Sequence, residues 1–159
     1  MVCQFRLFSS LISWSDIPVV LNAMPNLHYL NVQKNPRLFR HFLPSKNYIH
    51  SNLQTLIISN TDANFSIVQS LLPCFPNLTE LHMAQNSLDE CDTSPMLLNS
   101  DGQSLLFELP AVNESKVTTL YLARNNFKSL LDCTPIGEYM FPKLEYLSLC
   151  ECPQLRRCS

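Results

Sequence analysis

One spacing of apolar residues recurs five times along this chain of 159 residues. Each copy places apolar residues at its first, fourth and sixth positions and a polar residue or a cysteine at its ninth. The copies are Leu27-Leu30-Val32-Asn35, Leu53-Leu56-Ile58-Thr61, Leu78-Leu81-Met83-Asn86, Val117-Leu120-Leu122-Asn125 and Leu144-Leu147-Leu149-Cys152. A repeated unit of this size cannot bury its apolar side chains alone, so neighbouring copies must stack on one another.

The first residues of successive copies lie 26, 25, 39 and 27 residues apart. Three of these four steps fall in the 20–29 residue range of leucine-rich repeats. The sequence therefore predicts an α/β fold of the leucine-rich repeat solenoid (horseshoe) class, with a parallel concave sheet and convex helices. We expect one domain over residues 1–159, with strand blocks near 27–35, 53–61, 78–86, 117–125 and 144–152. The long step predicts an inserted loop over residues 89–113, a segment rich in Ser, Asn, Asp and Pro.

A second element precedes three of the copies: Met24-Pro25-Asn26-Leu27, Phe75-Pro76-Asn77-Leu78 and Phe141-Pro142-Lys143-Leu144. Two of these prolines follow helix-like segments over residues 15–23 and 64–72, and a proline cannot continue the helix before it. We expect Ser15 and Asp16 to cap the first helix. The chain has only two Gly, so we expect it to turn chiefly at Pro and Asn. At the ninth position, an Asn amide can bond to backbone groups that the bend leaves unpaired, and Thr61 and Cys152 are weaker substitutes.

Composition excludes several classes of protein. A hydrophobic fraction of 46% and a charged fraction of 15% are typical of a globular chain. The net charge of −2 and the scattered basic residues lack the electrostatic footprint of a nucleic-acid binder or a polybasic membrane patch. No apolar run approaches the ~20 residues of a membrane-spanning helix. We interpret residues 1–12 as part of the folded chain and not as a signal peptide.

Catalytic chemistry has no sequence support. Two Gly exclude a glycine-rich phosphate loop, and the four His are spread along the chain. Cys150 and Cys152 stand too close together for usual zinc spacing and lack a second pair of ligands. We therefore expect no enzyme activity, no cofactor, no metal site and no small-molecule substrate, and we interpret the seven Cys as free thiols.

A protein partner is the ligand that the pattern favours. Residues between the core positions of each block alternate toward the concave side of the sheet, where we expect them to face solvent. Tyr and Arg are frequent anchors of protein interfaces. The predicted partner-binding residues are Tyr29, Asn31, Gln33, Ile57, Glu80, His82, Tyr121, Arg124, Tyr146 and Ser148.

The segments Ser13-Trp14-Ser15-Asp16-Ile17 and Met24-Pro25-Asn26-Leu27-His28-Tyr29-Leu30-Asn31-Val32-Gln33-Lys34-Asn35-Pro36 resemble the leucine-rich repeat region of tubulin-specific chaperone E and tubulin-folding cofactor E-like proteins. The blocks that begin at Phe75 and Phe141 fit the same pattern, and the similarity covers most of residues 13–155. The family's Gly-rich and ubiquitin-like domains have no counterpart here, so the resemblance implies a fragment. It also implies a cytoplasmic, cytoskeleton-associated module that binds α-tubulin and acts in tubulin folding, heterodimer turnover or tubulin stability.

Two other interpretations remain open at this point. One is a generic cytosolic or nuclear leucine-rich repeat adaptor or regulatory subunit, whose repeats are commonly nearer 22 residues than the 25–27 found here. The other is a secreted ectodomain. That interpretation predicts disulfides and glycans at the Asn-x-Ser/Thr sites of Asn64, Asn77 and Asn113.

Overall fold

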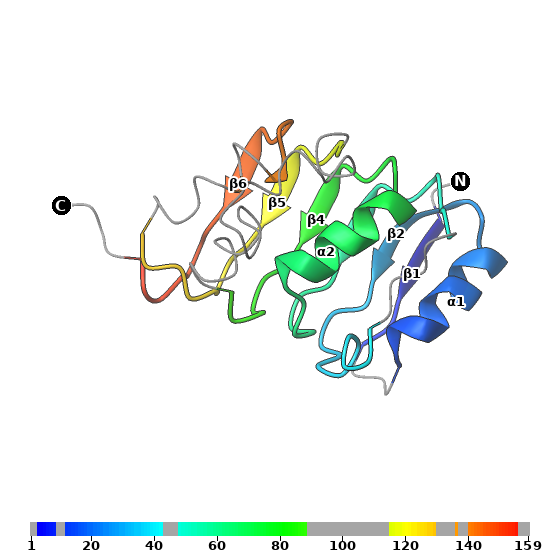
Figure 1. Ribbon diagram of the computed structural model, residues 1–159, viewed down its shortest axis with the longest axis horizontal. Coiled ribbons are helices and arrows are strands. Elements are labelled where there is room, and N and C mark those ends of the chain that lie inside the picture. Colours follow the sequence, from blue (N-terminus) through cyan, green and yellow to red (C-terminus); the bar gives the residue numbers. More distant parts are fainter. Residues whose placement is uncertain are drawn as a thin grey trace, which may run out of the picture.

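The computed structural model describes residues 3–8, 12–42, 48–88, 115–129, 136 and 140–155. Its described part is built on a six-stranded parallel sheet whose strands follow one another in chain order (Figure 1). The strands are β1 Cys3–Arg6, β2 Leu27–Asn31, β3 Thr55–Ile57, β4 Glu80–His82, β5 Thr119–Tyr121 and β6 Tyr146–Ser148. Each strand pairs in parallel with the next, so all six strands begin at the same end of the sheet.

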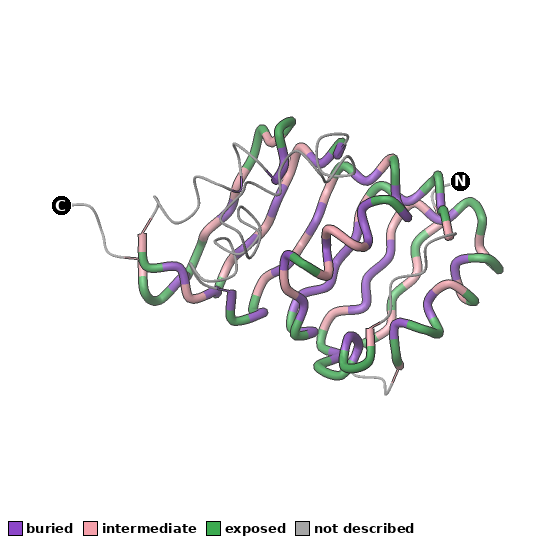
Figure 2. Tube along the Cα trace, viewed as in Figure 1, coloured by how far each residue is buried: buried purple, intermediate pink, exposed green. Residues whose placement is uncertain are grey.

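One face of the sheet carries the core. The fourth positions of the five sequence copies lie side by side in register: Leu30, Leu56, Leu81, Leu120 and Leu147. The first four of these side chains are at most 1% exposed, so the predicted apolar pattern is confirmed as the interior of the molecule. The buried stretches run through the centre of the strands and into the turns that follow them (Figure 2).

Two helices cover this core face. A short 3-10 helix, η1 Trp14–Asp16, leads into α1 Ile17–Ala23, and α2 Phe65–Leu71 leads into a second 3-10 helix, η2 Leu72–Cys74. Both α-helices lie on the same side of the sheet (Figure 1). We call the opposite side of the sheet the open face.

The helix starts differ slightly from the prediction. The cap of the first helical segment is Ser13, whose side chain accepts a hydrogen bond from the Ser15 backbone N–H, while Asp16 bonds back to the Ser13 N–H. The expected cap at Asp16 is confirmed in part, because Asp16 completes this reciprocal capping box and is the N-cap residue of α1, whereas the capping hydroxyl belongs to Ser13 and not to Ser15. Asn64 caps α2 by accepting from the Ile67 N–H at 2.9 Å.

The turns after the strands are joined by buried asparagines. We call Asn35, Asn86 and Asn125 the asparagine ladder, and their exposed fractions are 1%, 7% and 0%. Asn125 makes four hydrogen bonds through its side chain. Its Nδ2 donates to the carbonyls of Met83 and Leu122 at 3.1 and 2.8 Å, and its Oδ1 accepts from the N–H groups of Asn86 and Leu88 at 3.0 and 3.1 Å.

Asn86 repeats this arrangement one strand earlier. Its Oδ1 accepts from the N–H groups of Thr61 and Ala63 at 2.9 and 3.3 Å, and its Nδ2 donates to the Ile58 carbonyl at 3.0 Å. Each amide therefore ties its own turn to the turn of the preceding strand. This confirms the predicted role of the ninth position.

Thr61 and Cys152 take the ninth position in the two copies that lack Asn there, and they are weaker substitutes, as predicted. Thr61 donates its hydroxyl to the Ile58 carbonyl at 2.6 Å, within its own turn. Cys152 reaches the Leu122 carbonyl of the preceding strand with its sulfur, at 3.5 Å. A hydroxyl or thiol has a single hydrogen to donate, whereas an amide has two donors on nitrogen and a separate oxygen that accepts.

A left-handed residue precedes every ninth position. Lys34, Asn60, Gln85, Arg124 and Glu151 have φ between 54° and 61°. Four of these five bends contain an Asn, as expected, at Asn35, Asn60, Asn86 or Asn125, but the left-handed residue itself is Asn only at Asn60. Polar non-glycine residues take the strained conformation because the hydrogen bonds of the buried ladder hold the turn around them.

The strands β2 to β6 each fall inside one predicted block, while β1 was missed. Its alternation of half-buried Cys3 and Phe5 with exposed Gln4 and Arg6 lacks the leucine spacing, although that alternation is a strand signal. The predicted inserted loop over residues 89–113 lies outside the described residues. The horseshoe curvature and the single-domain assignment stay predictions.

Candidate functional site

The open face presents two rows of side chains that run across all six strands. One row comprises Gln4, Tyr29, Thr55, Glu80, Thr119 and Tyr146, and the other comprises Arg6, Asn31, Ile57, His82, Tyr121 and Ser148. Because strand register fixes these rows, residues that are 25 to 39 positions apart in the sequence become neighbours in space.

Three aromatic rings form a continuous strip over β4, β5 and β6. The His82 and Tyr121 rings are stacked, with centroids 4.1 Å apart and planes inclined by 20°. The Tyr121 and Tyr146 rings follow at 5.5 Å with a tilt of 54°. We call His82, Tyr121 and Tyr146 the aromatic strip. Tyr146 is 51% exposed, so the strip offers apolar ring surface to solvent.

A carboxylate fixes one end of the strip. Glu80 Oε1 lies 2.8 Å from His82 Nε2, and Glu80 Oε2 accepts a hydrogen bond from the Thr55 hydroxyl at 3.2 Å. A carboxylate only accepts, so Nε2 of His82 carries the proton of this hydrogen bond. The contact holds the imidazole flat against Tyr121 and reduces the rotamer freedom that binding would otherwise remove.

A second cluster occupies the other end of the open face. The Arg6 guanidinium lies 5.3 Å from the centroid of the Tyr29 ring, a cation–π distance. Arg6 also donates to Gln4 Oε1 at 3.3 Å, and Asn31 Nδ2 donates to the Tyr29 hydroxyl at 3.3 Å. Arg6 was missed in the sequence because β1 was missed, and the Cys3–Arg6 alternation is the signal that would have found it.

Three of the residues predicted to face solvent are buried instead. Asn31 is 5% exposed, and Ile57 and Ser148 are each 8% exposed. Asn31 folds back onto its own strand end, where its Oδ1 accepts from the Gln33 N–H at 3.1 Å. Ile57 lies between Asn31 and His82 in the register of the sheet. The exposure expected from alternation is wrong here because side chains of the same row pack against one another across neighbouring strands.

The other predicted residues keep some access to solvent. Tyr29, Gln33, Glu80, His82 and Tyr121 are partly exposed, and Tyr146 and Arg124 are exposed. The open face thus carries two accessible clusters, one around Tyr29 and one on the aromatic strip, with buried Ile57 between them.

An exposed ion pair borders the strip at the turns after β5 and β6. Arg124 Nε donates to Glu151 Oε2 at 2.5 Å. This hydrogen bond and the opposite charge lower the pKa of Glu151 and raise the pKa of Arg124. Both side chains are solvated, so the pair orients the groups more than it stabilises the fold.

The cysteines divide by burial. Of those that the structure describes, Cys74 and Cys152 are buried, Cys3 is half-buried and Cys150 is exposed. Burial raises the pKa of the Cys152 thiol, hydrogen bonds with the backbone of Asn125 and Arg124 oppose that rise, and the nearby Cys150 adds to it. Within the described ranges, no group of three or more His, Cys, Asp or Glu side chains is placed to hold a metal ion.

No helix in the described part of the chain has the length and apolar character needed to cross a bilayer.

The fold and the open face thus define an α/β protein with a six-stranded parallel sheet and a preformed aromatic surface. No protein-family model matches the chain. The chain is similar to three curated relatives that share the name "Tubulin-specific chaperone cofactor E-like protein". The relative from Caenorhabditis elegans is 39% identical over 84 residues, which is 50% of this chain and 18% of the relative.

The relatives from Rattus norvegicus and Homo sapiens are 22% and 21% identical over 136 residues, which is 86% of this chain and 28% of each relative. The matched region therefore spans between 18% and 28% of the length of these relatives. The family resemblance seen in the sequence is supported by these three matches.

Proposed function

We propose that this chain is a leucine-rich repeat solenoid that holds a tubulin-related protein partner on its open face. The aromatic strip of His82, Tyr121 and Tyr146 is the observation that carries this proposal. It is a fixed aromatic surface that is partly exposed at His82 and Tyr121 and exposed at Tyr146.

The strand order supports the solenoid. The parallel strands follow the chain order without exception among the six described, and a left-handed residue stands directly before each of the five ninth positions. Repeats that contact only their neighbours produce this arrangement. Helices are wider than strands, so the open face would line the concave side and would offer a curved surface to a partner.

The strip has the properties of an interface anchor. Tyr supplies a large amphipathic contact area and loses little conformational freedom on binding. His82 and Tyr121 are already stacked, and Glu80 already holds His82 in place. The ion pair of Arg124 and Glu151 provides a polar rim at the edge of the strip, as is usual around an apolar interface centre.

The similarity to cofactor E-like relatives supports tubulin as the partner class. We propose α-tubulin as the bound subunit, and a role in tubulin folding, heterodimer turnover or tubulin stability. The chain would act without catalysis or cofactor, by binding one tubulin state more tightly than another. The free thiols of Cys3, Cys150 and Cys152 are compatible with a reducing, cytoplasmic and cytoskeleton-associated setting.

The test is a pull-down of purified tubulin heterodimer by the immobilised full chain. We expect tubulin to be enriched over an unrelated leucine-rich repeat control, and the double variant Tyr121→Ala, Tyr146→Ala to lower affinity about tenfold or more. The matched control is Val19→Ala with Ile49→Ala, which removes apolar side chains that are 71% and 64% exposed outside the strip. Circular dichroism confirms that each variant is folded.

Two outcomes contradict the proposal in different ways. Absence of tubulin enrichment by the wild-type chain rules out the partner. An affinity for tubulin that is unchanged in the folded tyrosine double variant rules out the aromatic strip as the binding surface and leaves tubulin binding in place.

A further inference from the structure

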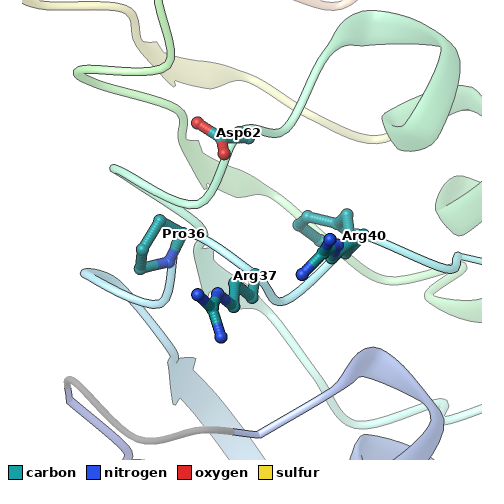
Figure 3. Close-up of a pocket in the computed structure, with 5 residues that line it drawn as sticks. Pro36, Arg37, Arg40 and Asp62 are labelled. Atoms are coloured by element: carbon teal, nitrogen blue, oxygen red, sulfur yellow. The ribbon is translucent and has the colours of Figure 1, made fainter.

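A separate pocket lies where the turns after β2 and β3 meet. It has a volume of about 320 Å³ and is lined by Pro36, Arg37, Phe39, Arg40 and Asp62. In Figure 3, the two arginines lie on one side of the pocket and Asp62 on the other. None of these residues belongs to the aromatic strip.

The arginine side of the pocket is held by the core. Leu38 and Phe39, which lie between the two arginines, are 1% and 7% exposed. The Phe39 ring stacks on Trp14 at 5.2 Å, and the Trp14 N–H donates to the Leu38 carbonyl at 2.8 Å. The Arg40 N–H donates to the Arg37 carbonyl at 3.2 Å, so one fixed turn presents both side chains.

The opposite wall is equally constrained. Asp62 has a φ of 58°, and the N–H groups of its neighbours Thr61 and Ala63 both donate to Asn86 Oδ1. The asparagine ladder therefore fixes the backbone that carries this carboxylate. The pocket walls are set before any ligand arrives, which reduces the entropy lost on binding.

The charges of the pocket are unbalanced. Arg37 and Arg40 are exposed, and neither forms an ion pair with Asp62 or with any other residue that the structure describes. Two guanidinium groups and one carboxylate leave a net charge of +1 (two positive minus one negative). Guanidinium groups bind planar carboxylates in a bidentate fashion, and Asp62 would repel a dianion more strongly than a monoanion.

We propose that this pocket binds an aspartate or glutamate side chain of an acidic segment in a protein partner. Arg37 and Arg40 donate to the bound carboxylate, and Asp62 accepts from a backbone N–H of the same segment. A volume of about 320 Å³ is at the lower end for ligand pockets, which suits one or two residues of a peptide. The inference does not depend on tubulin being the partner, because it rests on the pocket alone.

The test is fluorescence anisotropy of a labelled peptide of alternating Glu and Gly, titrated with the full chain at low salt. We expect Arg37→Gln and Arg40→Gln each to weaken binding about threefold, and the double variant about tenfold. The control is Lys116→Gln with Lys143→Gln, which removes the same charge from exposed residues outside the pocket and should change affinity less than about twofold. The same peptide with Gln in place of Glu should not bind.

Competition experiments test the role of Asp62 and the class of anion. At equal ionic strength, acetate should displace the peptide from the wild-type chain better than inorganic phosphate does. In Asp62→Asn, phosphate should become about threefold more effective, because the repelling charge is gone. The double variant of Tyr121 and Tyr146 should bind the peptide as the wild type does.

Equal losses in the arginine and lysine double variants would overturn the proposal, because binding would then follow net charge alone. Stronger displacement of the peptide by phosphate than by acetate in the wild type would show that the pocket prefers a phosphoryl group to a carboxylate. Unchanged competition by phosphate in Asp62→Asn would show that Asp62 does not act on the bound anion.

Discussion

The asparagine ladder and the aromatic strip are both built by placing one residue of each repeat beside its counterpart in the next. Asn86 and Asn125 lie in the turns, are at most 7% exposed, and exchange hydrogen bonds with the backbone of the preceding turn. His82, Tyr121 and Tyr146 lie on the open face and touch mainly one another, and Tyr146 is 51% exposed.

The difference shows that periodicity alone does not separate stability from function. A buried amide with all its partners in the protein contributes to folding, because its loss leaves backbone groups unpaired in the interior. An exposed ring has few partners within the protein, so its surface remains available to another molecule. Burial, and not position in the repeat, therefore distinguishes a side chain that stabilises the fold from one that another molecule can contact.

The largest effect is expected from Asn125→Ala. The change leaves the carbonyls of Met83 and Leu122 and the N–H groups of Asn86 and Leu88 without this partner, and we expect a loss of about 3 kcal/mol in the free energy of unfolding. Tyr146→Ala removes a larger side chain from the strip and should cost less than about 1 kcal/mol. Urea unfolding measures both values. Equal losses of unfolding free energy in the two variants would show that the ladder does not stabilise the fold more than the strip does.

A smaller effect is expected at the left-handed turns beside the ladder. Gln85 has a φ of 57° and an exposed side chain, so its replacement tests the backbone alone. Gln85→Val should destabilise the fold by about 1–2 kcal/mol, because a β-branched side chain fits this conformation poorly. Gln85→Gly is the matched control and should range from neutral to about 1 kcal/mol more stable. A Val variant as stable as the wild type would show that the ladder does not enforce the turn.

The smallest effect compares two cysteines that differ in burial. Cys152 occupies the last ladder position and is 8% exposed, whereas Cys150 is exposed. Because burial raises the pKa of Cys152 above its ordinary value of 9.0, its thiolate fraction at pH 8 is lowered. We expect iodoacetamide to modify Cys152 about tenfold more slowly than Cys150. Mass spectrometry of Cys150→Ser and Cys152→Ser measures each rate separately.

The raised pKa of Cys152 also makes the free energy of unfolding depend on pH. A raised pKa in the folded state means that the folded chain holds this proton more firmly than the unfolded chain. The contribution of Cys152 is therefore complete below about pH 9 and is lost as the pH rises through the folded value. Cys152→Ala should weaken the alkaline decline in the free energy of unfolding. Equal alkylation rates at the two sulfurs, or an unchanged alkaline decline, would mean that the ladder does not shield Cys152.

The sequence by itself determined the repeat, the parallel α/β arrangement, and the role of Asn at the ninth position. These features follow from local spacing, because Leu30, Leu56, Leu81 and Leu120 can be buried only if the copies stack. The tertiary structure decided which open-face residues are accessible and which neighbours they meet. Burial of Asn31, Ile57 and Ser148 depends on how side chains of adjacent strands pack in register, and the Arg37–Arg40–Asp62 pocket depends on two turns that are more than 20 residues apart in the chain. A one-dimensional pattern contains the period of the repeat, while contact between repeats depends on register and side-chain volume.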